Sequence, residues 1–200
     1  MLNILRNGEK GITGLETAII LIAFVVVAAV FAYTVLSAGV YATQTSQQAI
    51  YSGLHEASGT MQIKGSVVGY DDDLDENINS LKFVVACSAA GGAVNLTPPI
   101  DAEVDGIPDA DSEHRTVICY TDAHQRLPDI AWDTMAVGYT DGDDLLEEGE
   151  QVEITVSLTA LTTPLYKNTD FTLEVRPAEG STLIIARHVP AAVDAFTILQ

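Results

Sequence analysis

Basic residues are scarce in this chain of 200 residues, which has 9 lysines and arginines against 28 aspartates and glutamates. The formal net charge is −19, and nearly all of the acidic residues lie beyond residue 55. A protein that binds nucleic acid needs clustered positive charge to meet the phosphates, so this charge balance excludes a nucleic-acid partner. The acidity instead indicates a soluble module that is exposed outside the cell or to a salty medium.

Charged side chains are absent between Thr17 and Ser52, and the apolar run 18–36 within this segment leaves no polar helix face. About 20 such residues suffice to cross a bilayer. The chain also has no proline before Pro98, so we expect one helix over residues 12–58. At 1.5 Å per residue it would be about 70 Å long, whereas a hydrocarbon core is about 30 Å thick. The second half of this helix therefore exceeds what a simple membrane anchor needs.

Catalytic signatures are missing as well. The sequence has no phosphate-binding loop, no nucleophile elbow and no HExxH pattern. Its four histidines have no recognisable spacing relative to a nucleophile or a metal ligand: His55, His114, His124 and His188. We predict that the protein is not an enzyme and needs no cofactor.

The apolar segment has three interpretations. A secretory signal has an apolar region of only 7–15 residues before its cleavage site, which is shorter than the run here. A permanent signal anchor explains the hydropathy and the basic flank of Arg6 and Lys10, but it leaves the polar helical extension unexplained. The third interpretation is a leader that is clipped directly before the helix. Lys10-Gly11 followed by Ile12 resembles the cleavage site of the type IV pilin superfamily, which implies a leader over residues 1–11 and cutting after Gly11 by a membrane peptidase.

Cleavage after Gly11 would make Glu16 the fifth residue of the mature chain, at the start of an apolar helix. A lone buried carboxylate there would cost several kcal/mol, so it needs a partner. The freed α-amino group of Ile12 and the helix N-terminus are the available positive charges. Alternatively, Glu16 caps the first turn in solvent. Type IV pilins resemble this chain in carrying Glu at that position, and the resemblance implies a role in subunit docking.

Small residues recur four positions apart along the helix, which lets helices approach closely. The pairs are Gly14 with Ala18, Ala28 with Ala32, and Ala38 with Ala42. Between them, Phe24 and Phe31 lie seven residues apart and are expected to serve packing. A helix that is apolar all round must be covered on every side. Lipid covers it in the membrane, and after extraction a bundle of identical helices is the natural replacement.

Beyond Gly59 the pattern changes to short alternating runs separated by Asp/Gly/Pro-rich connections. We expect strands at residues 60–68, 81–88, 115–121, 134–140, 151–159, 170–176, 182–188 and 195–199. No helical pattern intervenes, which favours an antiparallel β-sandwich over residues 59–200. The fold class is therefore α+β, with a long N-terminal hydrophobic helix followed by a sandwich.

The last third of the chain resembles the C-terminal region of archaellins, the subunits of the archaeal swimming filament. Residues 145–156, LLEEGEQVEITV, and 171–190, FTLEVRPAEGSTLIIARHVP, carry the resemblance, and the N-terminal helix extends it to both ends. It implies an immunoglobulin-like sandwich in the outer wall of a filament whose core is made of the helices. It also implies an extracellular homopolymer or copolymer with paralogous archaellins, assembled from a precursor in the cytoplasmic membrane by a membrane platform and motor.

Two other functions are compatible with the sequence. An adhesive archaeal pilin would share the leader, the helix and Glu16, but its loss would abolish surface attachment instead of swimming. A membrane-anchored extracellular sandwich that binds sugar or metal would keep residues 1–11 and would stay with the cell body after shearing.

Modification and metal binding have weaker candidates. Asn95-Leu96-Thr97 is the one N-x-S/T sequon, and archaellins are commonly N-glycosylated on the sandwich. Cys87 shares its alternation phase with Leu81, Phe83 and Val85, and Cys119 shares its phase with Val117, so both cysteines are expected to face the core. Either a single disulfide between them or two buried free thiols would fit.

Asp101, Glu103 and Asp105, followed by Gly106, have the spacing with which a calcium loop begins. Position twelve of that loop would be Ser112 instead of Glu. Solvated acidic loops are therefore the simpler interpretation, with Ca²⁺ as the cation that the oxygens could chelate.

Overall fold

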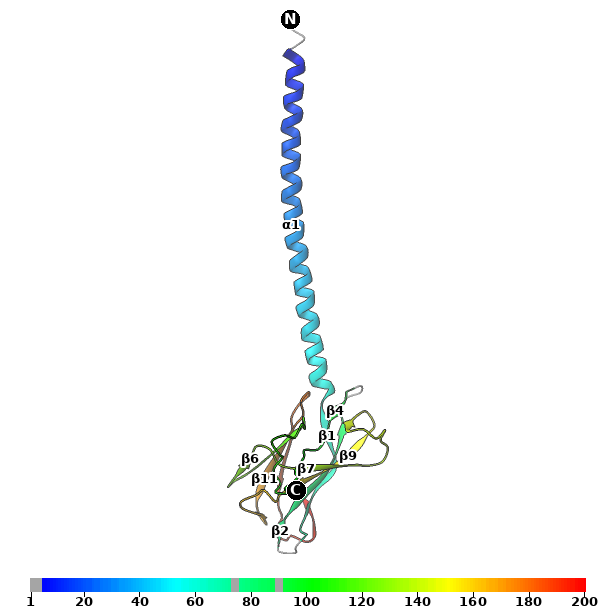
Figure 1. The fold of residues 1–200 in the computed structure, drawn as a ribbon, viewed down its shortest axis with the longest axis vertical. Coiled ribbons are helices and arrows are strands. Elements are labelled where there is room, and N and C mark those ends of the chain that lie inside the picture. Colours follow the sequence, from blue (N-terminus) through cyan, green and yellow to red (C-terminus); the bar gives the residue numbers. More distant parts are fainter. Residues whose placement is uncertain (1–4, 73–75, 89–91) are drawn as a thin grey trace. The chain divides into compact units, whose positions relative to one another are not determined.

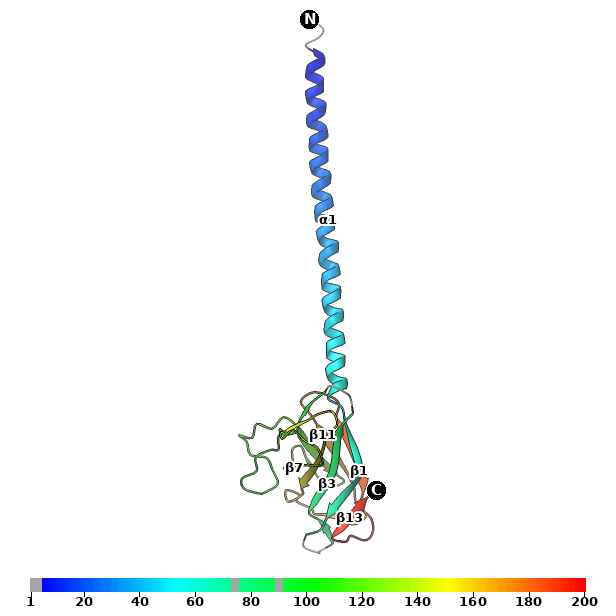
Figure 2. The ribbon, with the colours of Figure 1, turned by 90° about the vertical axis from the view of Figure 1, so that its right-hand side faces the viewer.

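A computed structural model describes residues 5–72, 76–88 and 92–200 of the protein. The chain divides into two compact units, residues 1–51 and 52–200. The first unit is helical, and the second contains the end of the helix and all of the strands. Figures 1 and 2 show the helix as one continuous coil and the strands as two layers.

Helix α1 runs over Leu5–Ser58 without interruption. It ends at the residue where the sequence pattern changes, and Gly59 N–H still donates to the carbonyl of His55 over 3.2 Å. It begins seven residues earlier than the expected start at Ile12, because neither glycine of the leader segment stops a helix that lacks proline. Within the described part, the stretch Gly14–Ala57 is long and apolar enough to span a membrane.

The larger sheet has five antiparallel strands in the order β13-β1-β3-β9-β7. Their bounds are Phe196–Leu199, Met61–Tyr70, Ser80–Cys87, Gln151–Ser157 and Trp132–Ala136. The pairing of β1 with β3 shifts between Lys64 and Val68. Gly65 lies in this irregular stretch with a φ of 87°, a backbone conformation that only glycine adopts without strain.

The second sheet has four antiparallel strands in the order β12-β11-β5-β6. Their bounds are Leu183–His188, Asp170–Arg176, Val117–Asp122 and Arg126–Leu127. Two small sheets complete the unit: β10 (Leu165–Tyr166) pairs with β2 (Asn77–Ile78), and β4 (Val94–Asn95) pairs with β8 (Leu145–Leu146).

A single hydrophobic core joins the inner faces of the two larger sheets, which confirms the α+β prediction. On β3, Leu81, Phe83 and Val85 are buried, and the residues between Leu81 and Val85 on the other face are only partly covered. From the four-stranded sheet, Tyr120 and Phe171 stack with ring centroids 6.0 Å apart. The alternation that predicted the strands is therefore the alternation that fills this core.

All eight expected strands are present, with two differences worth explaining. The strand expected at 134–140 is β7, which begins at Trp132 and ends at Ala136 because its ladder with β9 runs from Trp132–Val156 to Ala136–Val152. The five two-residue strands were not expected, since two residues are too short to show a period.

Candidate assembly surface

The side chains of helix α1 that are apolar are also exposed. Among the described residues, the large ones from Leu15 to Leu54 have exposed fractions of 49% to 73%. Phe24 and Phe31 are 73% and 69% exposed. Exposed apolar surface of this extent on a protein chain marks a site that lipid or another protein covers.

Several threonine hydroxyl groups on the helix donate to backbone carbonyls of the same helix. Thr34 donates to the carbonyl of Phe31 over 2.8 Å, Thr43 to that of Gly39 over 2.9 Å, and Thr45 to that of Tyr41 over 3.0 Å. Thr17 likewise donates to the carbonyl of Gly14 over 3.0 Å. An unsatisfied hydroxyl in an apolar environment is costly, so these bonds let the helix enter lipid or a helix bundle at little penalty.

The predicted assembly residues lie along this surface. Gly14, Ala18, Ala28 and Ala32 are exposed, and a methyl group added at Gly14 would meet nothing within 4 Å in the single chain. Glu16 is exposed too. Lys10, Gly11 and Ile12 belong to the helical backbone of α1. Gly14, Glu16 and the alanines are thus exposed in the single chain, and leader cleavage and the docking role of Glu16 stay predictions.

Neither of the two cysteines forms a disulfide in the described structure. Cys87 is at the end of β3 in the five-stranded sheet, where it is partly buried against the core. Cys119 was expected to face the core, and this is wrong: Ile118 and Tyr120 fill the core from β5, so Cys119 points to the opposite face. Cys119 is nevertheless fully buried. Of the two alternatives, the structure lacks the disulfide, but only one of the two thiols is fully buried.

The calcium candidates Asp101 and Asp105 accept hydrogen bonds from the backbone of their own loop. Asp101 accepts the N–H groups of Asp105 over 3.2 Å and Gly106 over 3.0 Å, and Asp105 accepts that of Ile107 over 2.9 Å. Glu103 is exposed. In the described residues, no three His, Cys, Asp or Glu side chains gather as they would around a metal. The spacing that suggested a cation site therefore builds a turn in which side-chain oxygens bond to the backbone.

Asn95, the glycosylation candidate, is half-buried in β4. Its Oδ1 accepts the N–H of Thr97 over 3.2 Å, and its carbonyl accepts the hydroxyl of Thr116 over 2.5 Å. The side-chain amide nitrogen is the atom that a glycan would modify. Glycosylation at this position stays a prediction.

One histidine contact was not foreseen. His114 Nδ1 is 2.9 Å from Ser112 Oγ, and His114 Nε2 is 3.0 Å from Asp129 Oδ2. Ser112 Oγ also accepts the N–H of Ile100 over 3.0 Å. Burial raises the pKa of Asp129, and His114 opposes this rise. These residue types also make catalytic triads, but here the serine oxygen already accepts a loop N–H, so the cluster ties the loop after β4 to the segment before β7.

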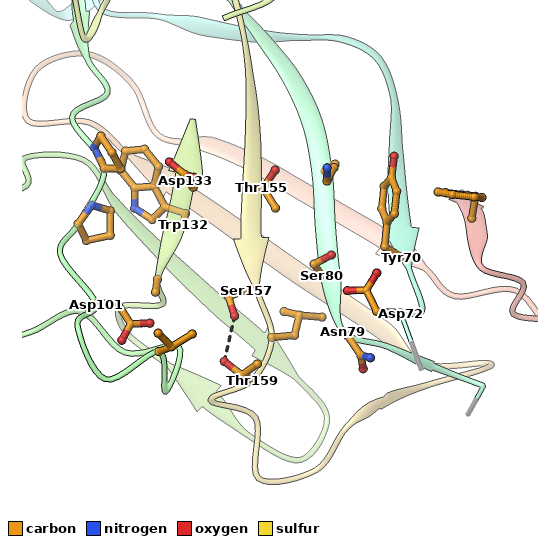
Figure 3. A pocket seen from close by; sticks show the side chains of 17 residues that line it. Tyr70, Asp72, Asn79, Ser80, Asp101, Trp132, Asp133, Thr155, Ser157 and Thr159 are labelled. Atoms are coloured by element: carbon orange, nitrogen blue, oxygen red, sulfur yellow. Dashed lines mark hydrogen bonds between the residues drawn. The ribbon is translucent and has the colours of Figure 1, made fainter. Parts of the chain in front are cut away.

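A hollow of about 1120 Å³ lies on the outer face of the five-stranded sheet (Figure 3). Hydroxyl and carboxylate groups line it, including Asp72, Asp133 and Thr155. Ser157 Oγ and Thr159 Oγ1 are 2.9 Å apart, as the dashed line in Figure 3 marks. The hollow has no histidine or cysteine among its described lining residues, so it offers hydrogen bonds but no activated nucleophile.

Fold and surface define a class of protein, namely a subunit that buries a long apolar helix in an assembly and carries a separately cored β-sandwich. Residues 11–187 match the family model of archaeal-type flagellin. "Probable flagellin 1" of Archaeoglobus fulgidus is 34% identical over 200 residues, covering 98% of this chain and 97% of that protein. A second relative, "Probable flagellin 1" of Aeropyrum pernix, is 28% identical over 92% of this chain and 94% of its own length.

Solved structures agree with these relatives. The archaeal flagellum of Methanospirillum hungatei strain JF1 matches with a TM-score of 0.62 and 28% identity over 93% of this chain and 98% of that chain. Flagellin FlaB1 from Methanocaldococcus jannaschii shares the fold with a TM-score of 0.54 and 13% identity, over 70% of this chain and 96% of that one. The chain belongs to the archaeal-type flagellin family and is a structural subunit of the archaeal flagellum filament, the archaellum.

Proposed function

We propose that the protein is made as a membrane-held precursor and is moved into an extracellular filament after its leader is removed behind Gly11. The observation that carries this proposal is the helix surface, which is exposed on all sides from Leu15 to Leu54. Water is a poor solvent for it, whereas lipid before assembly and helices of other copies after assembly both cover it.

Burial of this helix supplies the strength of the filament. Each Å² of apolar surface removed from water contributes about 25 cal/mol, so a helix with this many exposed large side chains holds its subunit tightly. The filament can then transmit rotation from a membrane motor made of other proteins. The subunit itself needs no catalytic step, and its polymer consists of this chain alone or with paralogous archaellins.

Glu16 is expected to guide docking. The chain carries no other charge between Thr17 and Ser52, so Glu16 is the one carboxylate near the mature helix start. Within an assembly its favourable partner is the α-amino group that cleavage would create at Ile12, on the same or a neighbouring copy. A Glu16→Gln variant keeps the shape and removes the charge, and it should reach the membrane but assemble poorly.

The deciding experiment is the N-terminal mass of the protein in filaments sheared from cells. A chain that starts at Ile12 supports leader removal and filament membership together. An intact Met1, or absence from the sheared fraction, would overturn the proposal and favour an anchored extracellular domain. Swimming assays on a deletion strain separate motility from adhesion, since an adhesive pilin would affect attachment instead.

A further inference from the structure

The exposed apolar side chains of the sandwich are concentrated at two edges of the five-stranded sheet. In the described part of residues 59–200, ten large apolar side chains are exposed. Two of them, Phe196 and Ile198, lie on β13, and Met135, Val137 and Tyr139 lie on β7 or directly after it. Three more lie in the loop that follows β4, and only two lie elsewhere, on β10 and β12. Clustering of this kind marks a contact surface.

One of these edges is formed by β13. Phe196 pairs with Tyr70 and Ile198 pairs with Val68 on β1, and Tyr70 lines the hollow on the outer face of the sheet. Both side chains of β13 therefore lie on the outer face. The ring of Phe196 contacts that of Tyr70 edge-on, with centroids 4.9 Å apart, but it is still 68% exposed, and Ile198 is 62% exposed. Residues 195–199 carry no charged side chain. We call Phe196 and Ile198 the β13 edge.

The loop after β4 forms the other edge. The N–H of Ala131 donates to the carbonyl of Gly106 over 2.9 Å, which holds this loop against the start of β7. Three of its apolar side chains are exposed: Ile100 at 56%, Val104 at 75% and Ile107 at 48%. We call these three residues the loop edge.

Val104 has an unfavourable backbone conformation in addition to its exposure. Its φ is 56°, in the left-handed region that β-branched residues avoid because of steric conflict. The loop maintains this conformation through Asp101, which accepts the N–H groups of Asp105 and Gly106. The side chain of Val104 is not part of the hydrophobic core, so the single chain gains no burial in return for the strain. Strain of this kind is typical of contact and binding sites, where burial of the side chain offsets it.

The two edges lie on opposite sides of one sheet. The strand order β13-β1-β3-β9-β7 separates them by three strands. In Figure 3, Asp101 and Trp132 lie on one side of the hollow and Tyr70 lies on the other. We propose that the β13 edge of one copy of this chain packs sideways against the loop edge of a second copy. The inference rests on the proposed function as a filament subunit. A contact between two different surfaces is heterologous, and such contacts repeat into open helical assemblies.

Charge favours this pairing over a symmetric one. Residues 101–111 carry five carboxylates, and those of Glu103 and Asp105 are exposed beside Val104. Two loop edges would therefore repel each other, and an anionic membrane surface would be repelled as well. The β13 edge is uncharged, so it can cover a loop edge without like-charge contact. Pairing of two β13 edges would leave both loop edges in water, whereas the mixed contact covers both apolar surfaces.

A small apolar surface is sufficient for this contact. Helices that hold neighbouring copies in one filament raise the effective concentration of their sandwiches, so weak contacts between sandwiches form. The contact is expected to involve side chains instead of strand pairing. The N–H of Thr134 on β7 already donates to Asp133 Oδ1 over 2.8 Å, and Gln200, directly after β13, bonds to the backbone of His188. Side-chain substitutions therefore test the proposal directly.

Two isoleucines on opposite sheets provide a matched test in whole filaments. Ile198 on β13 is 62% exposed, and Ile184 on β12 of the four-stranded sheet is 64% exposed. Ile198→Ser should release subunits from sheared filaments about tenfold faster than the unchanged chain, because it removes apolar contact at the interface. Ile184→Ser should release subunits at the unchanged rate. Sedimentation at raised temperature measures the release, and equal rates for the two variants would overturn the assignment of the β13 edge.

The sign of an introduced charge tests which surface faces the β13 edge. Ile198→Glu brings a carboxylate to the acidic loop edge, whereas Ile198→Lys brings the opposite charge. At low salt the Glu variant should release subunits about tenfold faster than the Lys variant, and high salt should reduce the difference. Adding Glu103→Lys to Ile198→Glu should recover most of the loss. Ile184→Glu and Ile184→Lys are the controls and should differ by less than about twofold. Equal release by the two Ile198 variants would overturn the pairing with the loop edge.

Val104→Asn separates the contact from the stability of the fold. Asparagine adopts a positive φ more readily than valine, so the urea midpoint of this variant should be unchanged or higher. The release of subunits should nevertheless be about fivefold faster, because the exposed apolar side chain is lost. Unchanged release would overturn the loop edge while leaving the filament itself intact. Absence of the unchanged chain from sheared filaments would overturn the proposed function instead. If Ile198→Ser does not fold, Val104→Asn keeps the test.

Discussion

At the scale of single residues, two glycines let the start of β1 touch the turn before β12. A Cβ added at Gly180 would meet the backbone of Gly59, and one added at Gly59 would meet the backbone of Glu179 and Gly180. Gly180 has a φ of 101°, which L side chains rarely adopt. Beside this contact, the hydroxyls of Thr60 and Ser181 are 2.9 Å apart. The glycine pair therefore lets these two backbone segments pack closely against each other.

We predict that Gly180→Ala lowers the free energy of unfolding by about 3 kcal/mol, since it adds steric conflict to backbone strain. Gly138→Ala is the matched control, because Gly138 has a φ of 89° and open space around its Cα, so it should lose only about 1 kcal/mol. Trp132 is the single tryptophan and is buried, so its fluorescence reports denaturant unfolding of the full chain in detergent. Equal losses in the two variants would contradict the contact argument.

Asp122 and Asp129 should change the stability of the fold in opposite directions as the pH falls. Burial would raise the pKa of Asp122, but hydrogen bonds from His124 N–H, Gln125 and Tyr120 outweigh it and lower the pKa below 3.8. Burial raises the pKa of Asp129 above 3.8, with His114 opposing. Asp122 therefore contributes stability above its unfolded pKa that is lost as pH falls through its lower folded pKa. Asp129 carries a penalty above its folded pKa that is relieved as pH falls through it.

We accordingly predict opposite effects of the two amide variants. Asp122→Asn should destabilise the fold at pH 7, and its difference from the unchanged chain should shrink near pH 3. Asp129→Asn keeps an acceptor for His114, so its stability relative to the unchanged chain should be higher at pH 7 than near pH 4. Urea midpoints at these pH values measure both effects. A difference for Asp129→Asn that does not change with pH would show that its carboxyl is not perturbed.

At the scale of elements, the sequence predicted the helix and those strands that are long enough to show a regular spacing of apolar residues. A helix of 54 residues and strands of four to ten residues show their pattern directly. The strand predicted at 134–140 lies at 132–136 in the structure. The prediction ran too far because Val137 and Tyr139 are residue types typical of strands, although they are exposed beyond the end of the ladder. Cys119 was assigned to the wrong face, because a buried residue on the outer side of a sheet breaks the rule that alternation separates core from solvent.

The same distinction holds for the functional surface. The uncharged segment beginning at Thr17 identified the assembly helix from composition alone. The outer face of the four-stranded sheet could not be read in this way, since Thr121, Thr172 and Ala186 are brought into one row only by the pairing of β5, β11 and β12. Side-chain bonds such as that of Glu150 to its own loop likewise depend on a backbone path that spacing does not reveal.

If the α1 helices of neighbouring copies pack closely in the filament, the small residues of α1 should not tolerate larger side chains. Ala28→Leu with Ala32→Leu adds bulk where neighbouring helices are expected to touch, and overpacking of this kind costs about 1–3 kcal/mol. Filament yield should fall about tenfold or more, while insertion into the membrane is unchanged. Val25→Leu with Val35→Leu is the control, because it enlarges side chains that are already large. Equal filament yields from both variants, measured in the sheared fraction, would contradict close contact at Ala28 and Ala32.

At the scale of the whole molecule, stability and assembly reside in different parts of the chain. Every member of the hydrophobic core lies between Met61 and Leu199, and the described side chains of α1 contribute none. The helix end contacts the rest of residues 52–200 through polar groups, among them the exposed pair of His55 and Glu179, 3.5 Å apart. Exposed ion pairs of this kind contribute little to stability.

A fragment of residues 53–200 should therefore fold without the apolar helix and stay soluble through its acidity. We expect one cooperative thermal transition by Trp132 fluorescence, with a midpoint within about 5 °C of the full chain in detergent, because a loss below about 1 kcal/mol shifts the midpoint of a domain this size by only a few degrees. The fragment should also sediment as a monomer, since the surface that drives polymerisation is missing. A broad transition, or a midpoint far below that of the full chain, would mean that helix burial stabilises the sandwich as well as the filament.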